Sequence, residues 1–170
     1  MTFNRDKYKQ ILYYFIRETS GVKFSNVGRT VLHKLLYFNE FDYYERYETP
    51  LTDETFIKQT HGPFSTHFEP LTEEMIREGV IICDTVNYKG KPQYRYRALK
   101  NMEVDLPQRE MENLEDTLRR YGTMTGSQIE AISHQDMPWI AAEESQKLDY
   151  EFVFYRSKGM AVTECSDDDS

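Results

Sequence analysis

The sequence has few cysteines and no long apolar run. Its 170 residues include two cysteines, Cys83 and Cys165, which stand far apart. This spacing suggests neither a disulfide framework nor a CxxC metal site, and it fits a reducing compartment. Charged residues interrupt the N-terminal stretch MTFNRDKYKQILYYFIRETS, which is unlike a signal peptide or a membrane span. We therefore expect a cytoplasmic protein with no membrane partner.

Net positive charge and catalytic motifs are also lacking. The formal net charge at pH 7 is -8, from 29 acidic and 21 basic residues, which makes nucleic acid an unfavourable partner. The sequence contains no GxSxG, P-loop, HExxH or dinucleotide-binding motif. Ser133 and His134 are adjacent rather than arranged as a nucleophile and its base. We expect no enzyme activity and no cofactor.

Aromatic residues, in contrast, are abundant. They make up 14% of the chain, with 13 Tyr and 10 Phe, so rings must form much of the core. The length suits one domain, which we place at residues 1–160. The remaining residues, 161–170, include TECSDDDS, which is too acidic and polar to pack, so we expect a disordered tail.

Apolar residues recur at helical spacing along much of the chain. The range 29–48 is apolar around much of its circumference, so we expect that helix to be central. Pro70 should break the third helix, with Thr72 capping its second piece. Thr125 and Gln128 form a capping box. The spacing predicts helices over 5–19, 29–48, 65–78 and 107–121, and a short helix after Thr125.

Residues 80–99 change to an alternating pattern around the turn Lys89-Gly90-Lys91-Pro92, which predicts a β-hairpin. The preceding segment 51–64 mixes polar residues with the pair Gly62-Pro63 and reads as an ordered connection. The predicted fold class is therefore mainly α with one β-hairpin, that is α+β. We expect a compact helical domain in a winged-helix-like arrangement.

Two stretches of the sequence carry a resemblance to a known family. The first, HKLLYFNEFDYYERYETPLTDETFIKQTHGPF, precedes the predicted hairpin, and the second comprises SHQDMPWIAAEE and LDYEFVFYR. Their order and spacing resemble the Panacea domain, also called the SocA-like antitoxin domain, from about Tyr8 to Arg156. The resemblance implies an antitoxin of a bacterial or prophage toxin-antitoxin system. Such a protein neutralises its cognate protein toxin through direct contact.

Aromatic residues of the range 29–48 are candidates for partner binding. Rings are favoured at interfaces because they contribute large area with few rotatable bonds. Core packing should hide most of them, and Tyr44 and Tyr47 are the better interface candidates. The crowded rings are Tyr37, Phe38, Phe41, Tyr43, Tyr44 and Tyr47.

Two further segments are candidates. Gly62 can adopt an unusual φ and Pro63 fixes the next one, so His61 and Phe64 are presented in a set geometry. This turn is either a rigid partner-binding loop or an aid in directing the chain into the next helix. The hairpin cations, among them Arg95 and Arg97, can steer an acidic toxin, touch phosphate, or protect a strand edge from aggregation.

Other readings of the polar residues are weaker. His61, His67 and Cys83 show no convergence and no fourth ligand, so we expect no metal. The acidic residues of the range 29–48, namely Glu40, Asp42 and Glu45, should form a solvated face. Two alternative functions stay open: an adaptor that delivers a partner to a protease, and a winged-helix DNA-binding regulator. Homo-oligomerisation also stays open.

Overall fold

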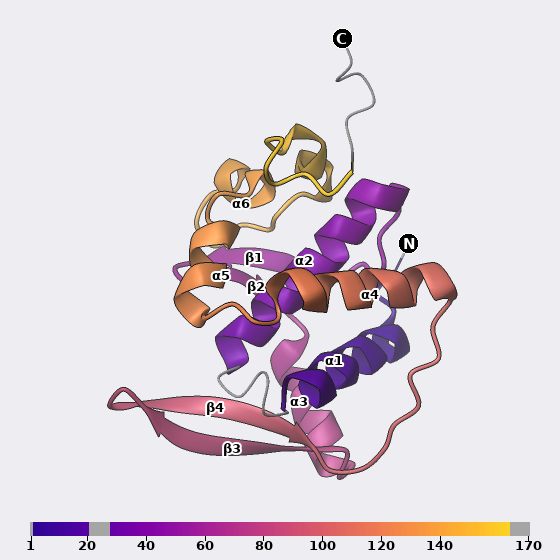
Figure 1. Cartoon of the computed structure of the whole chain (residues 1–170), viewed down its shortest axis with the longest axis vertical. Helices are drawn as coiled ribbons and strands as arrows, with labels where there is room; N and C mark the ends of the chain where they lie inside the picture. The colour runs from indigo at the N-terminus through magenta and orange to yellow at the C-terminus, as the bar shows by residue number, and fades with distance from the viewer. Residues whose placement is uncertain (1, 21–27, 164–170) are drawn as a thin grey trace.

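A computed structural model describes residues 2–20 and 28–163, and helices surround one central helix in it (Figure 1). The α+β class is confirmed, with a second hairpin beyond the predicted one. Among the described residues, no helix is both long and apolar enough to cross a membrane. The elements in chain order are α1 (Arg5–Thr19), α2 (Arg29–Tyr47), β1 (Phe56–Gln59), β2 (Gly62–Ser65), α3 (Phe68–Arg77), β3 (Ile81–Tyr88), β4 (Lys91–Ala98), α4 (Gln108–Tyr121), α5 (Gly126–Ser133), α6 (Met137–Ala141) and the 3-10 helix η2 (Tyr150–Tyr155).

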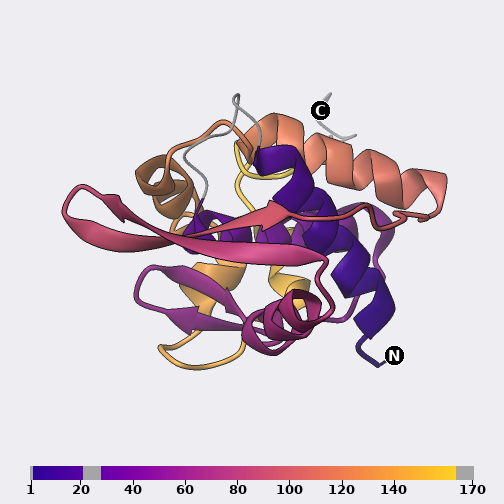
Figure 2. The same ribbon diagram turned by 90° about the horizontal axis from the view of Figure 1, so that it is seen from below.

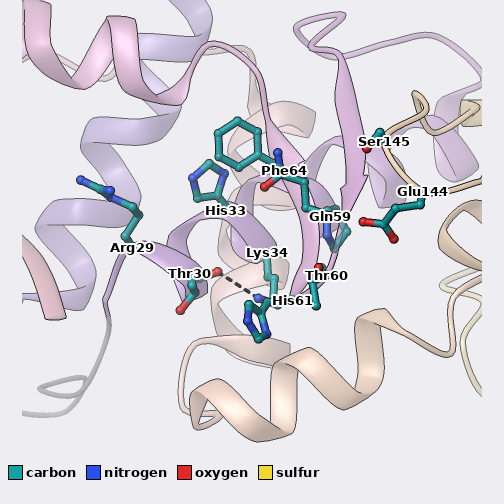
Figure 3. A pocket seen from close by; sticks show the side chains of 12 residues that line it. Arg29, Thr30, His33, Lys34, Gln59, Thr60, His61, Phe64, Glu144 and Ser145 are labelled. Carbon is teal, nitrogen blue, oxygen red and sulfur yellow. Dashed lines mark hydrogen bonds between the residues drawn. The ribbon is translucent and has the colours of Figure 1, made fainter. Parts of the chain in front are cut away.

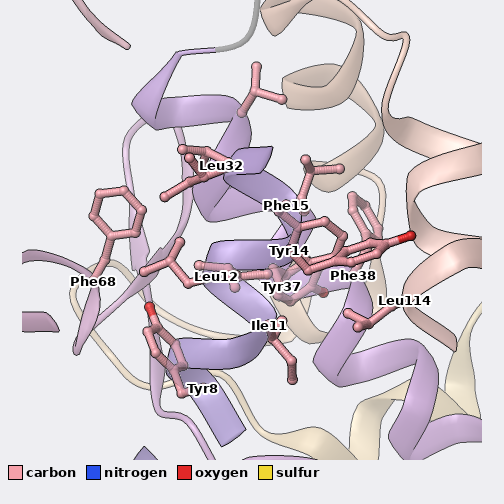
Figure 4. Close-up of a cluster of buried hydrophobic side chains, with 14 of the residues drawn as sticks. Tyr8, Ile11, Leu12, Tyr14, Phe15, Leu32, Tyr37, Phe38, Phe68 and Leu114 are labelled. Carbon is pink, nitrogen blue, oxygen red and sulfur yellow. The ribbon is translucent and has the colours of Figure 1, made fainter. Parts of the chain in front are cut away.

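The helix α2 is the centre of the fold, as predicted. It contacts α1, α4, α5, β2, β4 and η2. Because neighbours surround it, four of its six crowded rings are buried, namely Tyr37, Phe38, Phe41 and Tyr43. Figure 4 shows Tyr37 and Phe38 packed with apolar side chains of α1 and with Leu114 of α4.

The helix α3 corrects one prediction. It runs unbroken from Phe68 to Arg77, so the break expected at Pro70 is wrong. Pro70 lies in the first turn, where its missing N–H would have no helical partner in any case. The Thr72 hydroxyl donates to the carbonyl oxygens of Phe68 and Glu69 at 2.7 and 3.0 Å rather than capping a second piece. The capping box of Thr125 and Gln128 is confirmed.

The second hairpin, β1–β2, lies in the segment interpreted as a connection. Its strands are short and pair from Phe56 with Ser65 to Gln59 with Gly62. A distant segment completes the outer edge of β1: Lys58 N–H donates to the Gln146 carbonyl at 2.9 Å, and Leu148 N–H to that of Phe56 at 2.8 Å. This third partner, far along the sequence, stabilises strands that are too short to be evident from local pattern.

The predicted hairpin, β3–β4, is confirmed, with Ile81 paired to Ala98 at its base and Tyr88 to Lys91 at its tip. Lys89 and Gly90 both have positive φ, 52° and 81°, as a tight two-residue hairpin turn requires. Figure 2 shows the hairpin crossing one face of the molecule, with its tip projecting beyond the helices.

The acidic residues of α2 do not form the solvated face that we expected. Glu40, Asp42 and Glu45 are all buried. Arg156 donates to Asp42 and Glu45 at 2.8 and 2.9 Å, and the backbone N–H groups of 51–53 donate to Glu40. The Arg156 guanidinium comes from more than 100 residues further along the chain, so the local sequence gives no sign of it.

The C-terminal segment is held against α2 as far as it is described. The N–H groups of Val162 and Thr163 donate to the Glu45 carboxylate at 3.1 and 2.9 Å. The predicted disordered tail spans 161–170. Its residues 164–170, including Cys165, lie outside the described residues.

Candidate protein-binding site

The N-terminal end of α2 opens onto a cavity of about 530 Å³ (Figure 3). This volume is in the range of ligand-binding clefts. Three parts of the chain meet there: the first turns of α2, the β1–β2 turn, and the segment after α6. They contribute Arg29, Thr30, His33 and Lys34, then Gln59, Thr60, His61, Gly62, Pro63 and Phe64, and finally Glu144 and Ser145.

His33 has one ring nitrogen in use and one without a partner. The side chain is buried between Phe64 and Phe68, with ring centroids 4.6 and 4.2 Å away, and Nδ1 accepts the Ser65 N–H at 3.0 Å. Burial lowers the pKa of His33 to about 3, so the ring is neutral and Nε2 carries the hydrogen. Within the described residues this buried donor has no acceptor, an arrangement that costs about 1–3 kcal/mol.

Lys34 is the second buried donor. It is 3% exposed, and its Nζ donates to the Thr30 carbonyl at 3.4 Å. Burial lowers the pKa of Lys34 to about 8, with the nearby Glu130 acting in the opposite direction. The ammonium is therefore still largely charged at pH 7. Gly62 accommodates it: a Cβ at Gly62 would lie 2.7 Å from Lys34 Cε, and its φ of 136° also favours glycine.

The sequence-predicted turn residues come together at this cavity. His61, Gly62, Pro63 and Phe64 all line it. The His61 imidazole is exposed, with Nδ1 3.7 Å from a Glu130 carboxylate oxygen, whereas the Phe64 ring is half-buried against His33. The Gly-Pro pair thus positions part of a cavity wall.

Arg95 and Arg97 lie on β4 and do not line the cavity. Arg97 Nε is 2.7 Å from an Asp84 carboxylate oxygen, and Arg95 Nε donates to Gln93 at 2.6 Å. A second cavity of about 560 Å³ instead lies beside the hairpin tip and shares Arg29 and Thr30 with the first. It is lined by Arg29, Thr30, Tyr88, Lys89, Lys91, Pro92, Gln93 and Tyr94.

Arg29 joins the two cavities. Its guanidinium lies over the Tyr94 ring, 4.2 Å from the centroid, and donates to the Tyr96 hydroxyl at 3.2 Å. These contacts hold the middle of β4 to the first turn of α2. We call the combined lining of the two cavities the α2-tip surface.

Tyr44 and Tyr47 lie toward the other end of α2. At 1.5 Å per residue, Tyr44 is about 15 Å from Lys34 along the helix axis. The Tyr44 hydroxyl donates to Glu151 and its ring stacks on Tyr150 at 5.2 Å. Tyr47 packs on Tyr43 at 4.7 Å, under the Arg109 guanidinium. The predicted binding residues therefore occupy three separate places.

Sequence reasoning missed Arg29, His33 and Lys34 as parts of the site. The available signal was the His-Lys pair directly before Leu35 and Leu36, two polar residues within an apolar helix. His67, considered as a zinc ligand, is bound to Glu54 instead, and the described residues contain no group of three or more metal-ligating side chains.

The structure is a small α+β fold with two adjoining cavities at one end of its central helix. A family model described as the antitoxin SocA-like, Panacea domain matches residues 32–140. This match covers more than half of the chain, so the chain belongs to that family, as its sequence indicated. A comparison with curated proteins found no match.

Proposed function

We propose that the protein is an antitoxin that neutralises a co-expressed protein toxin by binding it directly. Membership of the SocA-like, Panacea family supports an antitoxin-like domain. The observation that carries direct binding is the α2-tip surface, in which two cavities adjoin through Arg29 and Thr30. The proposed role needs no catalysis.

The composition of the α2-tip surface suits a protein partner. Tyr88 and Tyr94 remain 37% and 40% exposed, and arginine and tyrosine are the residues that dominate interface energetics. The cations Arg29, Lys89 and Lys91 gather there, although the whole protein carries a net charge of -8. Such local positive charge favours an acidic segment of the toxin and accelerates the encounter.

The mechanism is steric occlusion of the toxin. The half-buried Phe64 and the hairpin tyrosines supply apolar contact, while Arg95 and Arg97 on the flank of the hairpin set the association rate. Tyr44 and Tyr47 stay a prediction for a second contact, at the far end of α2. His61, Gly62 and Pro63 form the wall on which the toxin segment rests.

The experiment is expression of the product of the adjacent open reading frame in a bacterial host, with and without this protein, followed by co-purification. We expect toxicity that the protein relieves in a stable complex. Tyr94→Ala should weaken the complex roughly 30-fold, as for an interface hot spot. Tyr155→Ala, which removes a 69% exposed ring of η2, is the matched control and should leave the affinity unchanged.

Two results would overturn parts of this proposal. A harmless or non-binding neighbour removes the antitoxin function, and salt-dependent binding of DNA then becomes the next measurement. A complex that forms equally well with Tyr94→Ala and with Phe64→Ala removes the α2-tip surface as its location. Circular dichroism of each variant establishes that the fold is intact.

A further inference from the structure

We infer that the cavity at the start of α2 is a carboxylate-binding site, in which His33 and Lys34 bind one carboxylate group of the partner. The inference rests on the proposed function and specifies the chemistry of the toxin segment. Two sources carry this group: an Asp or Glu side chain, or the C-terminal carboxylate of the toxin.

The first support is the unused hydrogen of His33. Its Nδ1 is occupied by the Ser65 N–H, and Phe64 stacks on the ring, so the ring cannot turn to satisfy Nε2 elsewhere without losing these contacts. Buried donors in native proteins are almost always paired. A fixed, unpaired donor in a cavity wall points to an acceptor that arrives with a ligand.

The second support is the adjacent buried ammonium of Lys34. No ion pair joins it to a carboxylate within the described residues, and its Nζ donates a hydrogen bond to the Thr30 carbonyl at 3.4 Å. A lysine that is only 3% exposed calls for a counter-charge. The backbone of Gly62 packs against the end of the Lys34 side chain, where a Cβ would lie 2.7 Å from Cε and 3.2 Å from Nζ.

The charge balance of the cavity favours a single negative charge. Glu144 lies on its rim, and Glu130 lies 3.7 Å from His61. Among the residues that line the cavity, Glu144 offsets one of the two positive charges of Arg29 and Lys34, so the lining keeps a formal charge of +1 that one carboxylate would balance. Glu130 is not part of the lining, and its side chain is 37% exposed, so solvent screens its charge.

The direct test uses acetate as the probe on the whole protein. Sodium acetate should shift the His33 Nε2 resonance in nitrogen NMR along a saturable curve, whereas sodium chloride at the same ionic strength should not. Lys34→Met, which keeps the aliphatic length but removes the charge, should abolish saturation. Lys147→Met, at an exposed lysine outside the cavity, is the control and should leave the curve unchanged. A shift that chloride reproduces, or that survives Lys34→Met, overturns the site.

The toxin complex then identifies the source of the carboxylate. Lys34→Met should weaken toxin binding roughly 30-fold, as expected when one partner of a buried charge pair is removed. Extending the toxin by one alanine displaces a C-terminal carboxylate and should cause the same loss if that group is bound. Otherwise one Glu→Gln or Asp→Asn change in the toxin should do so, and absence of any such loss contradicts the inference.

The two proposals fail separately. A complex that neutralises toxicity but is insensitive to Lys34→Met overturns the carboxylate site and leaves the antitoxin function standing. Lysine-dependent acetate binding without any toxin complex overturns the antitoxin function and leaves the site standing.

Discussion

Arg156 and Asp136 form a two-point ion pair in the interior of the protein. The Nε and a terminal nitrogen of Arg156 donate to the two carboxylate oxygens of Asp136 at 2.8 and 2.7 Å. Both side chains are at most 1% exposed. The guanidinium also binds Asp42 and Glu45 of α2, so one cation links α2 to the N-cap of α6 and to the end of η2.

Replacing Arg156 should therefore destabilise the protein strongly. Arg156→Met leaves buried carboxylates without their cation, and we expect a loss of about 3–5 kcal/mol in the free energy of unfolding, measured with urea. Arg119→Ala is the control, because Arg119 pairs with Asp116 on the exposed side of α4 and should contribute about 0–1 kcal/mol. Similar small losses for both variants would contradict this account.

His33 should make stability depend on pH. The pKa of His33 is 6.5 in the unfolded chain and about 3 in the folded protein. Between these two pH values the unfolded chain binds a proton and the buried ring does not, so the free energy of unfolding decreases as the pH falls. From pH 7 to pH 5 this loss amounts to about 2 kcal/mol. His33→Asn does not titrate, so the stability difference between the two proteins should shift by that amount. A pH-independent difference would refute the prediction.

Gly62→Ala should destabilise the β1–β2 hairpin and displace Lys34. The backbone φ of 136° disfavours any side chain, and the new Cβ would lie 2.7 Å from Lys34 Cε, so we expect a loss of about 1–3 kcal/mol. At Gly126 the new Cβ meets nothing within 4 Å, so Gly126→Ala should be neutral or slightly stabilising. Thermal unfolding of the two variants distinguishes local strain from a general effect of alanine.

The capping box of α5 gives a smaller prediction. Thr125 accepts the Gln128 N–H at 3.1 Å, and Gln128 accepts that of Thr125 at 2.9 Å. Thr125→Ala should cost about 1 kcal/mol in chemical unfolding. Ser127→Ala, at an exposed position of the same helix, should be neutral or slightly stabilising, and an equal cost there would exclude capping as the cause.

Elements with strong local patterns could be predicted from the sequence. The helix α1, the core position of α2 and the hairpin β3–β4 each follow from periodicity and turn residues within a few positions. The hairpin β1–β2 could not be predicted in this way, because its four-residue strands depend on pairing with residues near Gln146. Asp42 and Glu45 were misjudged for the same reason, since their cation is Arg156.

The candidate site was predicted only in part. The Gly62-Pro63 pair indicated an ordered turn, and the structure places this turn in a cavity wall. His33 and Lys34 gave only a weak signal, because polar residues beside a leucine run usually lie at a helix boundary or on a solvated face. Their importance depends on the distance between α2 and a turn some thirty residues later, which periodicity does not encode.

The position of Arg156 near the end of the described chain matters for how the protein folds during synthesis. The central helix α2 is synthesised early. The cation that pairs with its Asp42 and Glu45 side chains is synthesised more than ninety residues later, and so are Glu144 and Ser145, which form part of the cavity rim. A chain that ends before Glu144 leaves the Asp42 and Glu45 carboxylates without their cation and the cavity without part of its rim. We therefore expect such a fragment to be less stable than the whole chain, because its buried carboxylates lack their cation.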